Sequence, residues 1–249
     1  MSTQNPEPNR TERAASVQAE AARKQRNQRV ALVVGIVVVL GAIVAGGAWY
    51  TSGSGTTADT TSSGSNVALA AGDGSILVGD STAPVKVVIY EDFLCPYCRQ
   101  LEMETREFLR QNAAKGKVQV EYRPINILTQ STYSARAMNA WAAVLKNASP
   151  HAAWTLHDLL YDNQPYEASA DDTTDADILA LVAKAGGDNA AVEAAMKTQD
   201  AAFFKAATQV IADKGIRGTP TVFLNGTALE NQSVDQIAAT IEKAVAQAR

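Results

Sequence analysis

The sequence contains two cysteines, Cys95 and Cys98, with Pro96 and Tyr97 between them. Two thiols at this spacing can alternate between a dithiol and a disulfide. At the start of a helix, unpaired backbone N–H groups and the positive end of the helix dipole stabilise a thiolate, so Cys95 is expected to be exposed and anionic. Cys98 begins the apolar side of the helix and is expected to be shielded. One sulfur would therefore exchange with a substrate, and the other would resolve the mixed disulfide.

A zinc site and a pair of inert core thiols are the alternatives for these cysteines. A zinc site needs further ligands, but there is no second cysteine pair, and His151 and His157 lack finger-like spacing. Inert core thiols would have to fall by chance at the start of this helix. Neither a metal nor another cofactor is therefore expected. The two histidines, in a helical segment beside Trp154 and Leu160, are interpreted as packing residues.

The cysteine pair lies between a predicted strand and a predicted helix. Residues 85–90 (VKVVIY) have the apolar, β-branched composition of a buried strand, and residues 96–115 carry an apolar stripe at helical spacing. The other predicted elements are a strand over 117–123, helices over 131–147, 150–163, 174–186, 188–198 and 200–214, a strand over 221–224, a hairpin turn at 225–226 and a helix over 233–248. This order predicts an α/β fold with a helical insertion over residues 131–214.

The N-terminal part of the chain has the composition of a membrane anchor. Residues 1–29 contain six Lys or Arg and three Asp or Glu, whereas residues 30–50 are uncharged and long enough to cross a bilayer as a helix. Because the basic residues precede this span, residues 1–29 are predicted to be a cytoplasmic tail. A cleaved signal peptide is the alternative, although its apolar region would be shorter. The predicted location is the cell membrane, crossed once, with the remainder outside the cytoplasm.

The residues after this span divide into a linker and a domain. Residues 51–72 begin with a run of Gly, Ser and Thr and are predicted to be a flexible linker, and residues 73–249 to be the folded domain. The chain has a net charge of −4, and because residues 1–29 sum to +3, the remainder carries −7. An acidic domain lacks the basic surface of nucleic-acid-binding proteins, so no nucleic-acid partner is expected.

Four segments of the sequence resemble one protein family. EDFLCPYC at 91–98 is similar to the active-site segment of DsbA-like thioredoxin-fold proteins, above all the membrane-anchored thiol–disulfide oxidoreductases of actinobacteria. GIRGTPTVFLNG at 215–226 resembles the segment that carries the cis-proline of that family. YRPINIL at 122–128 and WTLHDLLYDNQ at 154–164 resemble the entry to the helical insert and a helix within it. The resemblance implies a thioredoxin fold with an inserted helical subdomain.

This resemblance also implies roles for individual residues. Cys95 would be the nucleophile, Cys98 the resolving cysteine, and Pro220 a cis-proline after Thr219, whose backbone would pair with a substrate peptide. An X–Pro bond tolerates the cis form at low cost, and a proline presents no N–H to the sulfurs. A trans-proline at the start of a strand is the alternative. Pro96 and Tyr97 would be supporting residues of the motif.

Two positions depart from the family pattern. Many thioredoxin-fold enzymes place a buried carboxylate six residues before the first cysteine, where this chain has Ile89. Glu91 and Asp92 are nearby, but neighbours at a strand end face opposite ways, so at most one of them would support Cys98, and solvation of either is the simpler interpretation. Tyr97 stands where the best-known oxidant of the family has histidine, and it adds no positive charge to stabilise a thiolate.

Together these features predict an extracytoplasmic thiol–disulfide oxidoreductase. As a dithiol oxidase, it would pass its disulfide to exported polypeptides that contain cysteine. The resemblance implies a quinone-linked membrane protein as its redox partner. A reductase or isomerase with the opposite redox poise is the nearest alternative. A non-catalytic holdase, whose helical insert binds unfolded chains, is another, although a holdase would not need the cysteine pair.

Overall fold

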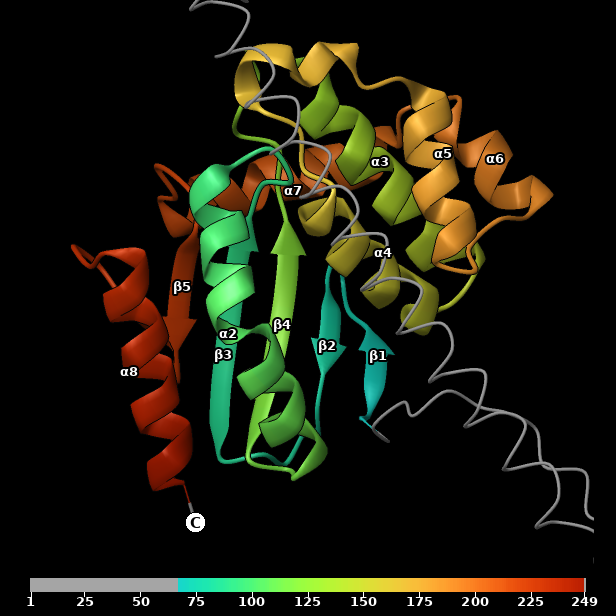
Figure 1. Ribbon diagram of the computed structural model, residues 1–249. Coiled ribbons are helices and arrows are strands. Elements are labelled where there is room, and N and C mark those ends of the chain that lie inside the picture. Colours follow the sequence, from blue (N-terminus) through green and yellow to red (C-terminus); the bar gives the residue numbers. More distant parts are fainter. Residues whose placement is uncertain (1–66, 249) are drawn as a thin grey trace, which may run out of the picture. The chain divides into compact units, whose positions relative to one another are not determined.

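A single mixed sheet organises the domain. The computed structural model describes residues 67–248, and within that range six strands are hydrogen-bonded in the order β1-β2-β4-β3-β5-β6 (Figure 1). β3 and β4 are parallel, and every other neighbouring pair is antiparallel. The strands are β1 (Leu69–Ala71), β2 (Ile76–Val78), β3 (Val85–Glu91), β4 (Val118–Pro124), β5 (Thr221–Leu224) and β6 (Thr227–Ala228).

β3 and β4 form the centre of the sheet. Both are rich in β-branched residues, which pack well on a pleated surface, and β4 alternates buried and half-buried side chains along its whole length. Val87 pairs with Val120 in their parallel register. Parallel neighbours need a crossover connection, and α2 (Pro96–Ala114) supplies it. The carboxyl end of β3 therefore leads, through a short loop, into the start of α2.

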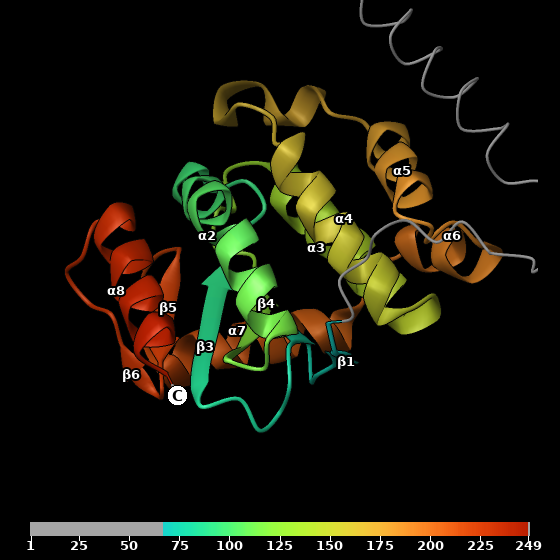
Figure 2. The same ribbon diagram turned by 60° about the horizontal axis from the view of Figure 1, so that its bottom comes forward.

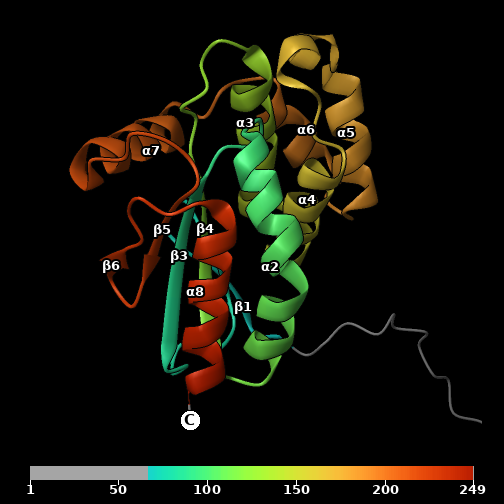
Figure 3. The ribbon, with the colours of Figure 1, turned by 60° about the vertical axis from the view of Figure 1, so that its left-hand side comes forward.

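Helices cover both faces of this sheet. α2 and α8 (Val234–Gln247) pack side by side on one face, whereas α7 (Ala201–Lys214) lies on the other (Figures 2 and 3). Apolar side chains of α7 pack against the buried Tyr90 and Ile125. The sheet is thus covered on both faces, and α2 packs against one of them.

The helical insert stands beside the sheet, against α2, β1 and β2 (Figure 1). Its elements are α3 (Thr132–Asn147), α4 (Pro150–Asp162), the 3₁₀ helix η1 (Glu167–Asp172), α5 (Asp175–Lys184) and α6 (Ala190–Met196). Each α-helix of the insert starts at a side chain that accepts a backbone N–H, namely Ser131, Ser149, Thr174 and Asn189. The buried residues of α3 and α4 belong to the same hydrophobic core as those of β3 and β4. Sheet and insert therefore share one core.

All of the predicted helices and strands are present, with ends within two residues of the prediction, and residues 225–226 form the predicted turn. β1, β2, β6 and η1 were not predicted, because strands of two or three residues and a 3₁₀ turn leave almost no periodic pattern. β1 lies inside the predicted linker, so the folded domain begins before Asp73. α7 was assigned to the insert, but beyond Phe203, which packs near Trp141, it runs across the sheet instead.

The predicted cytoplasmic tail, membrane span and first part of the linker, residues 1–66, lie outside the described residues. Among residues 67–248, no helix combines the length and the apolar character needed to cross a bilayer.

Candidate active site

Cys95 caps the N-terminus of α2, just beyond the carboxyl end of β3. Pro96 follows in the first turn, where its missing N–H costs no hydrogen bond. The backbone N–H groups of Cys98 and Arg99 donate to the Cys95 carbonyl oxygen at 3.1 and 3.2 Å. The Cys95 side chain makes no capping hydrogen bond, and both cysteines are free thiols. The backbone of Cys95 thus starts the helix while its sulfur takes no part in holding it.

A loop far along the chain lies against this sulfur. Sγ of Cys95 lies 3.2 Å from the Thr219 carbonyl oxygen, to which the thiol donates when it is protonated. The Thr219–Pro220 peptide bond is cis, as the resemblance implied. The fold therefore brings together two predicted site segments that are 124 residues apart in the sequence.

The two thiols have opposite acidities. The pKa of Cys95 is lowered to about 6, mainly because the Cys98 thiol donates a hydrogen bond to its sulfur. A hydrogen bond from Thr219 and backbone N–H groups of the first turn lower this pKa further, against the effect of burial. Burial raises the pKa of Cys98 well above its ordinary value, and interaction with Cys95 and the charge of Glu91 raise it further. At neutral pH, Cys95 is mostly a thiolate and Cys98 a thiol. Thiol–disulfide exchange requires this difference.

Cys95 is less exposed than the sequence indicated. Its exposed fraction is 4%, against 2% for Cys98. The expectation of an exposed sulfur was wrong because Thr219, from the cis-proline loop, lies directly on it. By contrast, Pro96 is exposed, and Tyr97 is 61% exposed. The motif thus presents its two central residues to solvent and keeps its sulfurs covered.

Two grooves flank the motif. One, of about 430 Å³, is on the side of the cis-proline, and its lining includes Tyr97, Thr219, Pro220, Gln232 and Val234. The other, of about 460 Å³, is on the side of the insert, and its lining includes Leu94, Pro96, Arg99, Gln164 and Tyr166. Each groove carries an exposed aromatic ring, from Tyr97 in the first and Tyr166 in the second.

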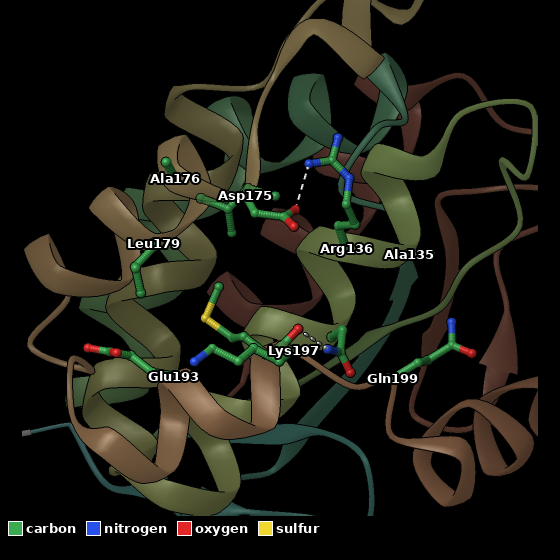
Figure 4. Close-up of a pocket in the computed structure, with 11 residues that line it drawn as sticks. Ala135, Arg136, Asp175, Ala176, Leu179, Glu193, Lys197 and Gln199 are labelled. Carbon is green, nitrogen blue, oxygen red and sulfur yellow. Dashed lines mark hydrogen bonds and ion pairs between the residues drawn. The ribbon is translucent and has the colours of Figure 1, made fainter.

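A cavity of about 490 Å³ lies within the insert, among α3, α5 and α6 (Figure 4). At its rim, Arg136 of α3 forms an ion pair of 2.9 Å with Asp175 of α5. Its lining includes neither cysteine nor any residue of the cis-proline loop. This cavity is therefore separate from the thiol site.

Asp92 is fully buried, and its carboxylate is saturated with hydrogen bonds. Oδ1 accepts from the Leu94 N–H at 2.9 Å and from the Ser134 hydroxyl at 2.6 Å. Oδ2 accepts from the N–H groups of Ile127 and Leu128, at 2.9 and 3.0 Å. The interpretation of Asp92 as solvated was wrong, because the start of the insert covers this strand end. Through these hydrogen bonds, Asp92 connects the loop before the cysteines to the start of the insert.

Glu91 is also buried, with 2% of its side chain exposed, so its interpretation as solvated was wrong too. Its Oε1 lies 2.7 Å from Nε2 of His157, a fully buried residue of α4. The rings of Phe93, Tyr122 and Tyr161 pack around the imidazole. His157 is thus a packing residue, as predicted, and an ion-pair partner as well, which was not predicted.

Two further residues near the cysteines were not anticipated. Glu102, on the buried side of α2, lies 3.9 Å from Nδ1 of His157. A charged residue within the apolar stripe of a helix was the available signal for it. Gln164 donates through Nε2 to the carbonyl oxygens of Phe93 and Cys95, at 3.0 and 3.1 Å. No sequence pattern predicts this role of Gln164, because the contact depends on how the insert docks.

No metal site is assigned within residues 67–248. Ligand atoms of Glu102, His157 and Asp158 do lie within 4.8 Å of one another. However, Nε of Arg106 is 2.8 Å from Glu102 and 3.6 Å from Asp158, so a guanidinium already supplies the compensating positive charge. These residues therefore form a buried ion-pair cluster.

The position of the dithiol defines the class of protein. One acidic and one protected sulfur, held where a parallel strand passes into its crossover helix, make this domain a thiol–disulfide oxidoreductase of thioredoxin fold. A family model described as thioredoxin matches residues 72–243, and the chain belongs to that family.

Known proteins similar to this chain include both separate proteins and parts of larger ones. The chain is 31% identical over 173 residues to the Na(+)/H(+) antiporter NhaA 3 of Salinispora tropica, which covers 69% of the chain but only 25% of the antiporter. It is 28% identical over 171 residues to the probable disulfide bond formation protein D of Bacillus cereus, covering 67% of the chain and 76% of that protein. Reduced DsbA from Mycobacterium tuberculosis superposes with a TM-score of 0.58 at 26% identity, over 70% of this chain and 94% of that structure.

Proposed function

We propose that this protein is a membrane-anchored dithiol oxidase that introduces or exchanges disulfides in exported polypeptides. The observation that carries the proposal is the placement of the two sulfurs, with Cys95 at the start of α2 against the Thr219 carbonyl oxygen and Cys98 buried behind it. In this arrangement the pKa of Cys95 is lowered to about 6 and that of Cys98 is raised. A thiolate that is stabilised in the reduced protein favours the reduced form, so the oxidised form gives up its disulfide readily. The similar Bacillus protein of comparable length, named for disulfide bond formation, supports the same direction.

In the proposed reaction, a substrate thiolate attacks Cys95 Sγ. The Cys95–Cys98 bond breaks, and Cys98 leaves with the electron pair and takes up a proton. A second substrate thiolate then attacks the substrate sulfur of the mixed disulfide and releases Cys95 as a thiolate. Two electrons thus pass from the substrate to the cysteine pair. The Thr219 backbone, in contact with Cys95, would hold the main chain of the substrate beside the sulfur.

The proposed location rests on the sequence of the N-terminal residues. Residues 30–50 would be the single membrane span, with residues 1–29 in the cytoplasm and the domain outside it. Its partners would be cysteine-containing polypeptides as they are exported, and a quinone-linked membrane protein would reoxidise it. Protease treatment of intact cells should remove the domain and spare a tag on the N-terminus. Protection of the domain would contradict this orientation.

Redox titration of the full-length chain against glutathione tests the direction of the reaction. The oxidase proposal expects a reduction potential above about −200 mV, whereas a value near the −270 mV typical of thioredoxin would identify a reductase. The oxidised chain should also transfer its disulfide to a reduced peptide with two cysteines. If no disulfide is transferred to the peptide, the alternative of a non-catalytic holdase is favoured.

A further inference from the structure

We propose that the groove on the insert side of the motif is a second binding site for the substrate polypeptide, and that it takes an aromatic side chain against the ring of Tyr166. This site rests on the proposed function and defines the substrates that the enzyme uses best, unfolded segments with an aromatic residue near the reacting cysteine. The Thr219 backbone would hold the chain on one side of that cysteine, and this groove would hold it on the other.

One wall of the groove is the exposed face of α2. Pro96 and Arg99 line it, and Met103 follows on the same face, because residues three and seven apart along a helix lie on one side. Among residues 67–248, the exposed large hydrophobic side chains are Tyr97, Met103 and Tyr166. Single apolar side chains scattered over a surface are ordinary, whereas a group of them around one site marks a surface that binds. Here all three belong to the first half of α2 or to the groove beside it.

The other wall is the loop between α4 and η1. Pro165 and Tyr166 line the groove from this side, and 87% of the Tyr166 side chain is exposed. Covering such a ring with another apolar group is favourable, and aromatic rings prefer to pack against other rings. Together with Pro96 of the opposite wall, this loop therefore offers three rings to one aromatic side chain of a bound polypeptide.

Gln164 gives the groove a hydrogen-bond acceptor. Its Nε2 donates to the carbonyl oxygens of Phe93 and Cys95, which fixes the amide and turns Oε1 away from them. Oε1 has no hydrogen-bond partner within residues 67–248 and is not among the buried polar atoms there, so it is open to solvent. A main-chain N–H of an extended segment can donate to it. Folded chains use most of these N–H groups internally, so the groove selects unfolded ones.

Arg99 adds donors on the wall of α2. Its Nε donates to the Tyr161 carbonyl oxygen at 2.9 Å, which holds the guanidinium in place. None of the ion pairs formed within residues 67–248 includes this exposed side chain. Its terminal N–H groups can therefore bind a main-chain carbonyl oxygen. A donor, an acceptor and a set of rings fit an extended polypeptide, whereas a purely apolar ligand would leave both polar groups unused.

The groove is continuous with the reactive sulfur. Pro96 belongs to both the motif and the groove, and Gln164 binds the carbonyl oxygen of Cys95. The groove of the cis-proline loop begins on the other side of the motif, with Tyr97 and Thr219. A chain that crosses the motif can thus enter both grooves while its cysteine reacts. Because one wall of the second groove follows α4, the insert contributes directly to the choice of substrate.

Photo-crosslinking tests where the substrate lies. In the full-length Cys98→Ser variant, the Cys95 thiolate attacks a peptide whose single cysteine is activated with thiopyridine, so thiopyridone leaves and a mixed disulfide forms whatever the redox direction. Two such peptides carry benzoylphenylalanine, either two residues before or two residues after the cysteine. One of them should crosslink to residues 164–167, as mapped by mass spectrometry. If both crosslink only elsewhere, for example to residues 232–235 of the cis-proline groove, the second site is wrong.

Substrate choice tests the role of Tyr166. The oxidised full-length chain is given two reduced peptides with two cysteines each, in which either tryptophan or serine flanks the first cysteine. The wild type should favour the tryptophan peptide in kcat/KM by about 10-fold, and Tyr166→Ser should reduce this preference at least about 5-fold. The rate with the serine peptide should not change, because an exposed ring supports neither the fold nor the exchange reaction.

Tyr166→Phe is the matched control for this experiment. It keeps the ring and loses only the hydroxyl group, so it should keep the preference of the wild type. An unchanged preference in Tyr166→Ser, or an equal loss of rate with both peptides, would overturn the role of Tyr166.

The second site and the oxidase proposal can fail separately. If the wild type oxidises neither peptide while crosslinks fall on residues 164–167, the oxidase proposal is wrong and the second site stands. If the wild type oxidises both peptides at the same rate and the crosslinks fall elsewhere, the second site is wrong and the oxidase proposal stands.

Discussion

Cys95 and Cys98 are neighbours on one helix, yet their surroundings are built in different ways. The pKa of Cys95 is lowered chiefly by the hydrogen bond from Cys98, then by one from Thr219 of the cis-proline loop and by backbone N–H groups at the start of its own helix. Cys98 faces the core, where Glu91 of the sheet is paired with His157 of the insert. The comparison teaches that the reactive sulfur depends mostly on its partner thiol in the motif, with a smaller contribution from the cis-proline loop, whereas the protected sulfur lies where two parts of the fold meet.

Replacing either cysteine should have the largest effect, because each variant removes one of the two sulfurs that are compared. Cys95→Ser should abolish disulfide transfer, and it should form no mixed disulfides. Cys98→Ser should also lose turnover, but it should accumulate mixed disulfides on Cys95, because the resolving thiol is missing. Non-reducing gels and mass spectrometry of the trapped species would show this. Trapping by Cys95→Ser instead would reverse the assignment of nucleophile and resolver.

His157→Phe tests the charged side of the comparison through stability. The new ring would lie among Phe93, Tyr122 and Tyr161. Glu91 would lose the imidazolium 2.7 Å away, whereas Glu102 would keep its ion pair with Arg106. We expect the free energy of unfolding, measured in urea, to fall by about 3–5 kcal/mol.

The matched control is the histidine in the first turn of the same helix. His151→Phe changes an exposed side chain and should stay within about 0.5 kcal/mol of the wild type. Equal effects of the two substitutions would mean that the buried cation adds no stability.

The Cys95 side of the comparison is tested by pH. The pKa of Cys95 falls from 9.0 to about 6 in the folded, reduced chain, so its rate of alkylation should reach half its maximum near pH 6. A lowered pKa stabilises the folded state fully above the unfolded value and loses this contribution as pH falls through the folded value, with an upper limit of about 4 kcal/mol. The difference in unfolding free energy between reduced wild type and Cys95→Ser should therefore be larger at pH 9 than at pH 5. An equal difference at both pH values would refute the lowered pKa.

Gln164→Ala should have the smallest effect on stability, and it tests whether the insert influences Cys95 as well as Cys98. The amide of Gln164 binds the carbonyl oxygens of Phe93 and Cys95 rather than a sulfur. We expect a loss of about 1–2 kcal/mol in unfolding free energy, with the pKa of Cys95 unchanged in alkylation experiments. Gln111→Ala, on the exposed side of α2, is the control and should change neither value. A raised pKa in Gln164→Ala would show that the insert also acts on the reactive sulfur.

The local half of the site could be predicted from the sequence. A proline after Cys95 and an apolar stripe that begins at Cys98 identify the start of α2 without any tertiary information. The cis bond before Pro220 was reached through the resemblance, because spacing alone does not bring residues 124 apart into contact.

The other half could not be predicted, because it depends on docking. Glu91 and Asp92 look like polar residues at an exposed strand end, and only the packing of α3 and α4 buries them. The same limit applies to the sheet. β1 and β2 are three residues each, and they become strands by pairing with each other and with β4 rather than through a strong pattern of their own.

The shared core has a consequence for attempts to make this enzyme smaller. α4 provides His157, and the loop after it provides Gln164. Joining β4 directly to α7 would leave a complete central sheet with its cysteine pair. It would also remove His157, the ion-pair partner of Glu91, and Gln164, which donates to the Cys95 carbonyl oxygen. A minimal thioredoxin obtained by such a deletion would keep the cysteine motif and lose the contacts of His157 and Gln164 that surround it. A shortened version must therefore keep α4 and the loop after it as far as Gln164.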